Sequence, residues 1–155
     1  MKINRVFRQW CCSLRNGKDI IMKIKDGRIV PGKSIGIYRL GIKKSELLQL
    51  LSNEFKTNGG KYGDEIISIE NARFWLNKDD VLYQIGVSKG FEGGYDNIIK
   101  IGATLKIIQE KYGGYEEIHD TYSIRGIGGM CFELEDVEEW SEETAPIEWI
   151  YVYKC

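Results

Sequence analysis

The sequence has little of the chemistry that enzymes use. Its 155 residues include one histidine, His119, and no Ser-His-Asp or Cys-His arrangement can be traced from it. The four cysteines, Cys11, Cys12, Cys131 and Cys155, lack the paired C-x-x-C spacing of zinc sites. No glycine-rich segment matches a P-loop or a dinucleotide-binding turn. We therefore predict a protein that is not an enzyme, with no catalytic residues, no metal site and no cofactor.

Long apolar runs are also missing. The stretch over 9–14 lies between Arg8 and Arg15 and is too short and polar for the core of a secretory signal. No other segment is apolar enough to span a membrane. Because the cysteines form no recognisable disulfide framework, a reduced compartment is the simplest interpretation. We predict a cytoplasmic protein that makes no membrane contact.

The length and composition are those of one folded domain. A chain of this size can bury a core without disulfides or metal, and aromatic residues make up 12% of it. Residues 1–34 are predicted to form a basic segment, in which 1–16 form either a short helix or a loosely attached leader and a hairpin turns at Asp26-Gly27. Residues 35–155 are predicted to form a single α+β domain.

This domain contains one pattern twice, over 35–90 and over 95–153. Each copy starts with a short apolar segment and a glycine, Gly41 or Gly102, and continues as an amphipathic helix. The predicted buried stripes are Leu47, Leu48, Leu50, Leu51 and Phe55 in the first copy and Leu105, Ile107, Ile108 and Tyr112 in the second. A hydroxyl near each start, on Ser45 and Thr104, can cap the helix. Gly59-Gly60 and Gly113-Gly114 are expected to end the two helices.

Period-two alternation of apolar residues follows each helix and predicts strands. The predicted strands are 66–70, 72–76 and 81–87 in the first copy and 118–124, 130–134 and 147–153 in the second. We therefore predict two helix-plus-β-meander repeats that form a mainly antiparallel sheet, with both helices packed on one face.

An acidic loop over 136–144 is the main departure from the repeat. It replaces the short turn of the first copy, and loops are where function is most often carried. A tryptophan among carboxylates suits a binding surface, because aromatic residues anchor interfaces and charge steers partners. The predicted partner-binding residues are Glu133, Glu135, Asp136, Glu138, Glu139, Trp140, Glu142, Glu143 and Glu148. The same pattern also fits a well-solvated acidic surface.

The charges are segregated along the chain. Basic residues dominate 1–30 and acidic residues dominate 116–148, although the formal net charge is only −1. An acidic surface favours a basic protein as partner and disfavours direct contact with nucleic acid.

Three segments carry a resemblance to a known family. They are Gly36-Ile-Tyr-Arg-Leu-Gly41, Lys100-Ile-Gly-Ala-Thr-Leu105, and the ending Cys131-Phe-Glu-Leu-Glu-Asp136 with Ala145-Pro-Ile-Glu-Trp-Ile-Tyr-Val152. Over 35–153 the chain resembles small cytoplasmic immunity proteins of bacterial polymorphic-toxin and contact-dependent growth-inhibition systems. The resemblance implies a protein that binds and blocks a cognate toxin, often a nuclease. The acidic loop fits this role independently, because nuclease active sites are basic.

Two other functions remain open from the residues. One is a small-ligand binding or enzymatic domain, with a site between the copies near Gly90–Gly94 and His119. The other is an adaptor that contacts nucleic acid through the basic N-terminal stretch, where Phe7 and Trp10 could stack on bases.

Overall fold

The computed structural model describes residues 22–52, 54–60 and 63–155. Within these residues the chain forms two α-helices and two β-sheets whose neighbouring strands pair antiparallel. The predicted α+β class with a mainly antiparallel sheet is therefore confirmed. The helix predicted over 1–16 and the stacking residues Phe7 and Trp10 lie outside the described residues.

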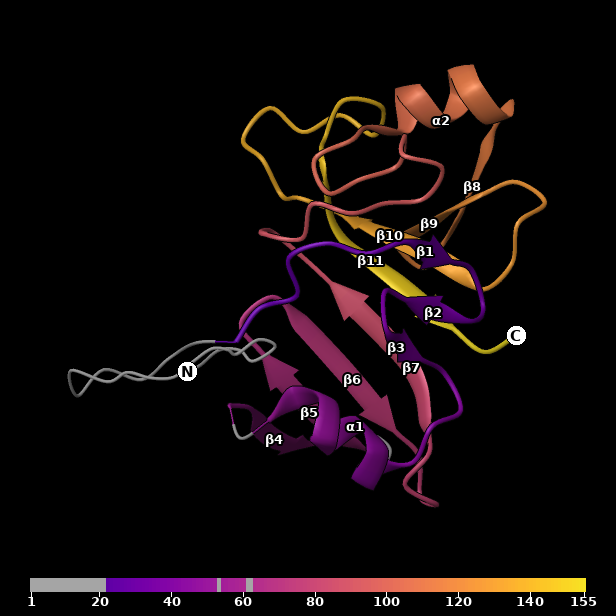
Figure 1. The fold of residues 1–155 in the computed structure, drawn as a ribbon. Helices are drawn as coiled ribbons and strands as arrows, with labels where there is room; N and C mark the ends of the chain where they lie inside the picture. The colour runs from indigo at the N-terminus through magenta and orange to yellow at the C-terminus, as the bar shows by residue number, and fades with distance from the viewer. Residues whose placement is uncertain (1–21, 53, 61–62) are drawn as a thin grey trace.

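The large sheet extends across the whole molecule. Its described strands are β4 (Lys56–Gly59), β5 (Glu65–Ile69), β6 (Ala72–Leu76), β7 (Leu82–Val87), β8 (Tyr115–Ile118), β9 (Thr121–Ile124), β10 (Met130–Leu134) and β11 (Ile147–Tyr153). They pair in the order β4-β5-β6-β7-β11-β10-β9-β8. Figure 1 shows α1 (Lys44–Leu51) at the β4 end of this sheet and α2 (Leu105–Tyr112) at the β8 end.

Strands 72–76, 130–134 and 147–153 have the predicted bounds, whereas the single strand predicted over 118–124 is wrong. That segment is the hairpin of β8 and β9, and His119 lies in its two-residue turn and not in a strand. His119 and Asp120 have φ of 52° and 65°, which such turns require at both positions. Strands β4 and β8 were not predicted, because neither shows an apolar alternation.

The two helices end differently. Gly113 follows α2 with φ of 84°, so the predicted stop after Tyr112 is confirmed. The stop predicted at Gly59-Gly60 is wrong, since α1 ends at Leu51 and Gly59 belongs to β4. Thr104 occupies the N-cap position of α2, but its hydroxyl makes no capping hydrogen bond.

A small sheet precedes α1. It consists of β1 (Ile29–Val30), β2 (Ser34–Ile35) and β3 (Tyr38–Arg39). The hairpin predicted at Asp26-Gly27 is wrong, because Ile29 pairs with Ile35 across a turn that contains Pro31-Gly32. Gly27 serves a close approach instead, since a Cβ there would lie 2.7 Å from the Cα of Gly36. The predicted boundary between the basic N-terminal segment and the α+β domain, placed between 34 and 35, falls inside β2.

The core forms on one side of the large sheet. In β6 the side chains of Ala72, Phe74 and Leu76 are fully buried, whereas Arg73 between them is exposed. This alternation is the pattern of a sheet with one face on the core. The same core cluster includes residues of both helices and of the segment before β2, namely Met22, Ile24, Ile29, Leu47, Leu51, Leu105 and Ile108.

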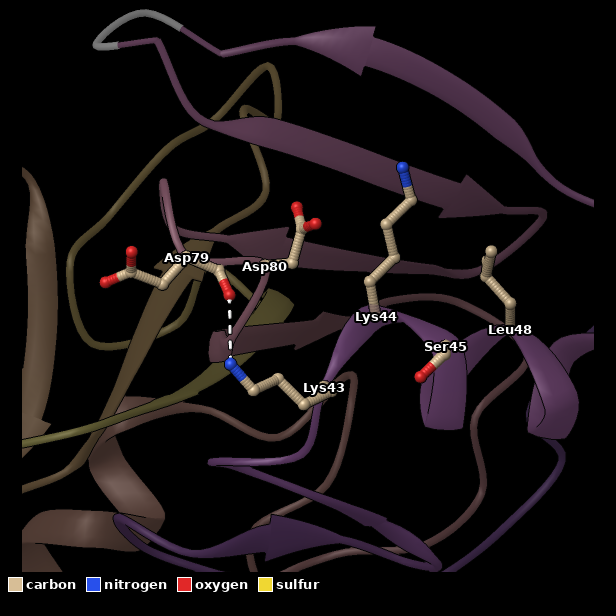
Figure 2. A pocket seen from close by; sticks show the side chains of 6 residues that line it. All are labelled: Lys43, Lys44, Ser45, Leu48, Asp79 and Asp80. Carbon is tan, nitrogen blue, oxygen red and sulfur yellow. Dashed lines mark hydrogen bonds between the residues drawn. The ribbon is translucent and has the colours of Figure 1, made fainter.

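The start of α1 is attached to the turn between β6 and β7. The Lys44 amide donates to the carbonyl oxygen of Asp80 over 2.8 Å, and Lys43 Nζ donates to the carbonyl oxygen of Asp79 over 3.3 Å. Figure 2 shows the two lysine side chains pointing apart, with Lys43 directed to Asp79. Lys44 forms an ion pair with Glu65 at 2.7 Å. The helix start is thus held without a side-chain cap.

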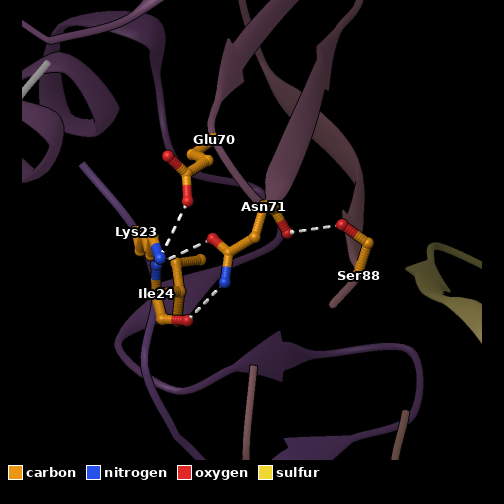
Figure 3. A network of polar contacts seen from close by, with 5 residues as sticks. All are labelled: Lys23, Ile24, Glu70, Asn71 and Ser88. Carbon is orange, nitrogen blue, oxygen red and sulfur yellow. Dashed lines mark hydrogen bonds and ion pairs between the residues drawn. The ribbon is translucent and has the colours of Figure 1, made fainter. Parts of the chain in front are cut away.

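Asn71 attaches the first described residues to the sheet (Figure 3). It lies in the β5–β6 turn and is 1% exposed, the sole buried polar residue in the described parts of the chain. Its Nδ2 donates to the carbonyl oxygen of Ile24 over 2.8 Å, and its Oδ1 accepts from the Ile24 amide over 2.9 Å. This pair satisfies both backbone groups of a buried residue that belongs to no strand.

We predict that Asn71→Ala lowers the free energy of unfolding by about 2–3 kcal/mol, because it leaves two buried backbone groups of Ile24 without partners. Urea denaturation measures the change. Glu70→Ala is the control in the same turn, since it removes only the half-exposed ion pair with Lys23, at 2.9 Å, and should cost less than about 1 kcal/mol. Equal effects of the two variants would contradict the role given to Asn71.

Candidate functional site

The acidic loop, residues 136–144, connects β10 to β11 at the edge of the molecule. Its base is closed by a hydrogen bond from the Glu135 amide to the carbonyl oxygen of Pro146, over 2.7 Å. The Ala145 amide donates to the carbonyl oxygen of Ser141 over 2.8 Å, and Ala145 itself is fully buried. The loop is therefore anchored at its base and at its returning end, and most residues between these anchors are exposed to solvent.

Glu142 fixes the loop to the far end of the large sheet. Its carboxylate accepts hydrogen bonds from the Tyr115 hydroxyl over 2.7 Å and from the Tyr122 hydroxyl over 3.4 Å. The bond to Glu142, with burial adding to it, raises the pKa of Tyr115 to about 12. Next to Glu142, the carbonyl oxygen of Glu143 accepts a 3.3 Å hydrogen bond from the Lys106 amide in α2. Glu142 thus acts as an anchor and is less free to meet a partner than its neighbours.

The remaining loop carboxylates are exposed and uncompensated. Glu138 and Glu139 directly precede Trp140, which is 49% exposed, and Glu143 follows it in the same loop. Between 133 and 148 the sequence contains eight acidic residues and no Lys or Arg. In the parts of the chain that the structure describes, none of these carboxylates forms an ion pair. Like charges held together on an anchored loop create a negative potential that attracts cations.

The other predicted residues lie around the base of the loop. Asp136 and Glu135 are exposed just beyond β10. Glu148 is the extra residue of a bulge in β11, because Glu133 pairs with Trp149 and Leu134 with Ile147. Glu133 lies on the sheet face opposite the core, where its Oε1 accepts a 2.6 Å hydrogen bond from Tyr151. The nine predicted residues therefore extend from the loop around to the outer face of the sheet.

Sequence reasoning missed the aromatic side chains on that outer face. We define the aromatic face as Trp75 of β6 and Trp149, Tyr151 and Tyr153 of β11. The signal was present, since the side chains that alternate with the buried Ile150 and Val152 are aromatic instead of polar. The bulge at Glu148 obscures it, because strict alternation would place Ile147 on the same face as Trp149, whereas Ile147 is buried in the core.

The alternative small-ligand site is not assembled as predicted. A groove of about 550 Å³ does lie beside Gly93 and Gly94, between the segments 26–31 and 92–97. His119 is not among the residues that line it, and the β8–β9 turn that contains His119 is exposed. Among the described residues, no group of three or more His, Cys, Asp or Glu side chains is placed to hold a metal ion. No described helix is both long and apolar enough to cross a membrane.

The chain matches no protein-family model, no curated protein and no solved structure. Its function is therefore inferred from its own residues and their contacts. The resemblance to immunity proteins stays a prediction.

We predict that Tyr115 titrates near pH 12, above the ordinary value of 10, because the charged carboxylate of Glu142 favours the neutral phenol. The hydrogen bond to the loop is then fully present below pH 10 and is lost as the pH rises through about 12. NMR of tyrosine labelled at Cζ measures the pKa, and Glu142→Gln should lower it. Tyr83 is the internal control, because burial and a hydrogen bond to Asp64 raise its pKa to about 12 independently. A Tyr115 pKa near 10 in the unaltered protein would refute the anchor.

We also predict that Gly86→Ala lowers the free energy of unfolding by about 1–3 kcal/mol. A Cβ at Gly86 would lie 2.7 Å from two ring atoms of Tyr151, so the aromatic face would have to move. Gly59→Ala in β4 is the matched control, since no atom lies within 4 Å of its Cβ position. Thermal unfolding compares the two. A harmless Gly86→Ala would mean that Tyr151 does not rest against β7.

Proposed function

We propose that this chain is an immunity protein, which binds a cognate bacterial toxin and blocks its basic, substrate-binding surface. The toxin is a nuclease in this proposal. The immunity protein needs no catalytic residue, because it acts by occupying the place of the substrate phosphates.

The observation that carries the proposal is the anchored acidic loop. Its backbone and Glu142 are held by the protein, while Glu138, Glu139 and Glu143 remain exposed and unpaired around a half-exposed Trp140. A surface ordered in advance loses little conformational entropy on binding. Carboxylates at fixed positions can meet a basic cleft with complementary charge, which speeds association and excludes neutral surfaces. Trp140 supplies the aromatic anchor that charge alone lacks.

We further propose that the fold consists of two copies of a helix followed by a four-stranded meander, with both helices on one face of the sheet. The strand order supports this, because β4 to β7 and β8 to β11 each pair in chain order and join through their last strands. The shared core cluster, with Leu47 of α1 and Ile108 of α2, supports a common face for the helices. In this arrangement the acidic loop is an insertion at the last turn of the second copy.

We predict that the triple variant Glu138→Lys, Glu139→Lys, Glu143→Lys weakens binding to the toxin at least about tenfold, because it turns attraction into repulsion. The probe is the polypeptide encoded by the neighbouring gene, and calorimetry measures the dissociation constant. Affinity of the unaltered protein should fall as salt rises, since these charges are exposed and screened.

The control is Glu46→Lys, Glu92→Lys, Glu110→Lys, which changes the net charge equally at exposed positions outside the loop. It should leave the dissociation constant within about threefold. Equal weakening by both triple variants would show that overall charge, and not the loop, determines affinity. Absence of any complex with the unaltered protein would count against the immunity function itself.

A further inference from the structure

The outer face of the large sheet is unusually aromatic at its centre. In an antiparallel sheet with one face on the core, the other face is normally polar and solvated. Here the register places Trp75 beside Gln84 of β7, and Tyr151 between Gly86 and Cys131. Large aromatic side chains therefore occupy positions where the alternation calls for polar ones. Such a departure on the central strands marks a surface that does more than face water.

The aromatic side chains form one packed layer. The rings of Trp149 and Tyr151 are stacked, with centroids 5.9 Å apart and planes at 10°. Trp75 meets Tyr151 edge-on at the same centroid distance. Tyr151 lies across Gly86, where any larger side chain would collide with its ring. Tyr151 is only 9% exposed, so the partly exposed rings of Trp75 and Trp149 present the surface, and rigid rings do so at low entropic cost.

One polar group of this layer, the Tyr151 hydroxyl, already has a hydrogen-bond partner. The Tyr151 hydroxyl donates to Glu133, and burial with this bond raises the pKa of Tyr151 far above its ordinary range. Arg73 places its guanidinium carbon 4.6 Å from the centroid of the Trp149 ring. These two contacts hold the layer together within one chain. Trp, Tyr and Arg are also the residues that most often carry binding energy in interfaces between different proteins.

The chemistry of the layer favours a cationic partner. The contact of Arg73 with Trp149 shows that one ring of the layer accepts a guanidinium. Glu133 adds a carboxylate at the edge of the layer, and its neighbour across the bulge is Glu148. Through these two residues the aromatic face is continuous with the base of the acidic loop. One basic surface that curves over the ends of β10 and β11 can therefore contact both.

We infer that the aromatic face is a second contact surface for the same basic toxin domain, which places Arg or Lys side chains and apolar groups on the partly exposed Trp75 and Trp149, while the buried Tyr151 supports both rings. The inference rests on the proposed function, because it takes its partner from it. The acidic loop provides steering, and the aromatic face provides the desolvated centre of the complex.

Trp75 gives the sharpest test, because it lies on β6, with β7 and β11 between it and β10. Trp75→Ala should weaken binding of the neighbouring-gene polypeptide about tenfold or more, and Trp75→Phe should recover most of the loss. Asn71→Ala serves as the control for stability, since it weakens the fold without removing a side chain of the aromatic face. It should leave the dissociation constant within about threefold, and thermal unfolding verifies that every variant is folded at the assay temperature.

Three results would overturn the inference, and they separate it from the proposed function. If Trp75→Ala binds normally while the loop variant does not, the immunity function stands and the aromatic face is not a contact. If Asn71→Ala loses as much affinity as Trp75→Ala, stability explains the loss. If sedimentation shows that the unaltered protein is a dimer and Trp75→Ala a monomer, the face binds a second copy. Absence of binding by the unaltered protein would reject both proposals together.

Discussion

The pairing of β7 with β11 is the constraint on which the rest of the structure depends. In the large sheet the strands that follow α1 and those that follow α2 meet at this ladder, where Ile85 pairs with Val152 and Val87 with Ile150. These four side chains are fully buried and form the middle of the core. On the opposite face the same ladder sets Gly86 beside Tyr151, which allows the aromatic layer to lie flat. Core and outer face are therefore determined by one register, as the two-residue period of a strand requires.

In the proposed complex, the acidic loop and the aromatic face share a boundary and contribute differently to binding. The acidic loop is long and charged, and it is held at its base, at its returning end, through the Glu142 carboxylate and through the Glu143 carbonyl oxygen. The aromatic face is flat and rigid, and it lies on the central strands. Glu133 of β10 lies between the two surfaces, where it accepts a hydrogen bond from Tyr151. A partner that meets both surfaces would gain specificity from charge and affinity from desolvated rings, which agrees with how strong interfaces distribute their energy.

Much of the architecture could be predicted from the sequence where a segment has a clear period. In 72–76 and 130–134 every second residue, counted from the first, is apolar, and the observed strands have those bounds. Prediction of secondary structure failed where contacts between distant segments determine the local conformation. Strand β4, with the polar sequence Lys-Thr-Asn-Gly, exists because it pairs with β5 and not because of its own pattern. The Asp26-Gly27 pair suggested a turn, but the glycine is needed where the chain passes close to Gly36.

The candidate site was predictable only in part, for similar reasons. Exposure of the acidic loop follows from its composition, but the hydrogen bonds from Tyr115 and Tyr122 to Glu142 join segments 20 or more residues apart. Because of the bulge at Glu148, Ile147 and Trp149 point to opposite faces of the sheet, although they are two residues apart. The sequence around Glu148 contains no signal that predicts this bulge. Without knowledge of this bulge, the sequence does not predict the aromatic face as one layer.

The most direct test of the central claim is growth. The polypeptide encoded by the neighbouring gene would be expressed in a sensitive bacterial strain, alone and together with this chain, and growth would be followed in both cultures. The account predicts that the polypeptide alone stops growth and that co-expression restores it through a nanomolar complex. Toxicity that persists despite a well-expressed, folded chain, or a neighbouring product that is harmless, would contradict it.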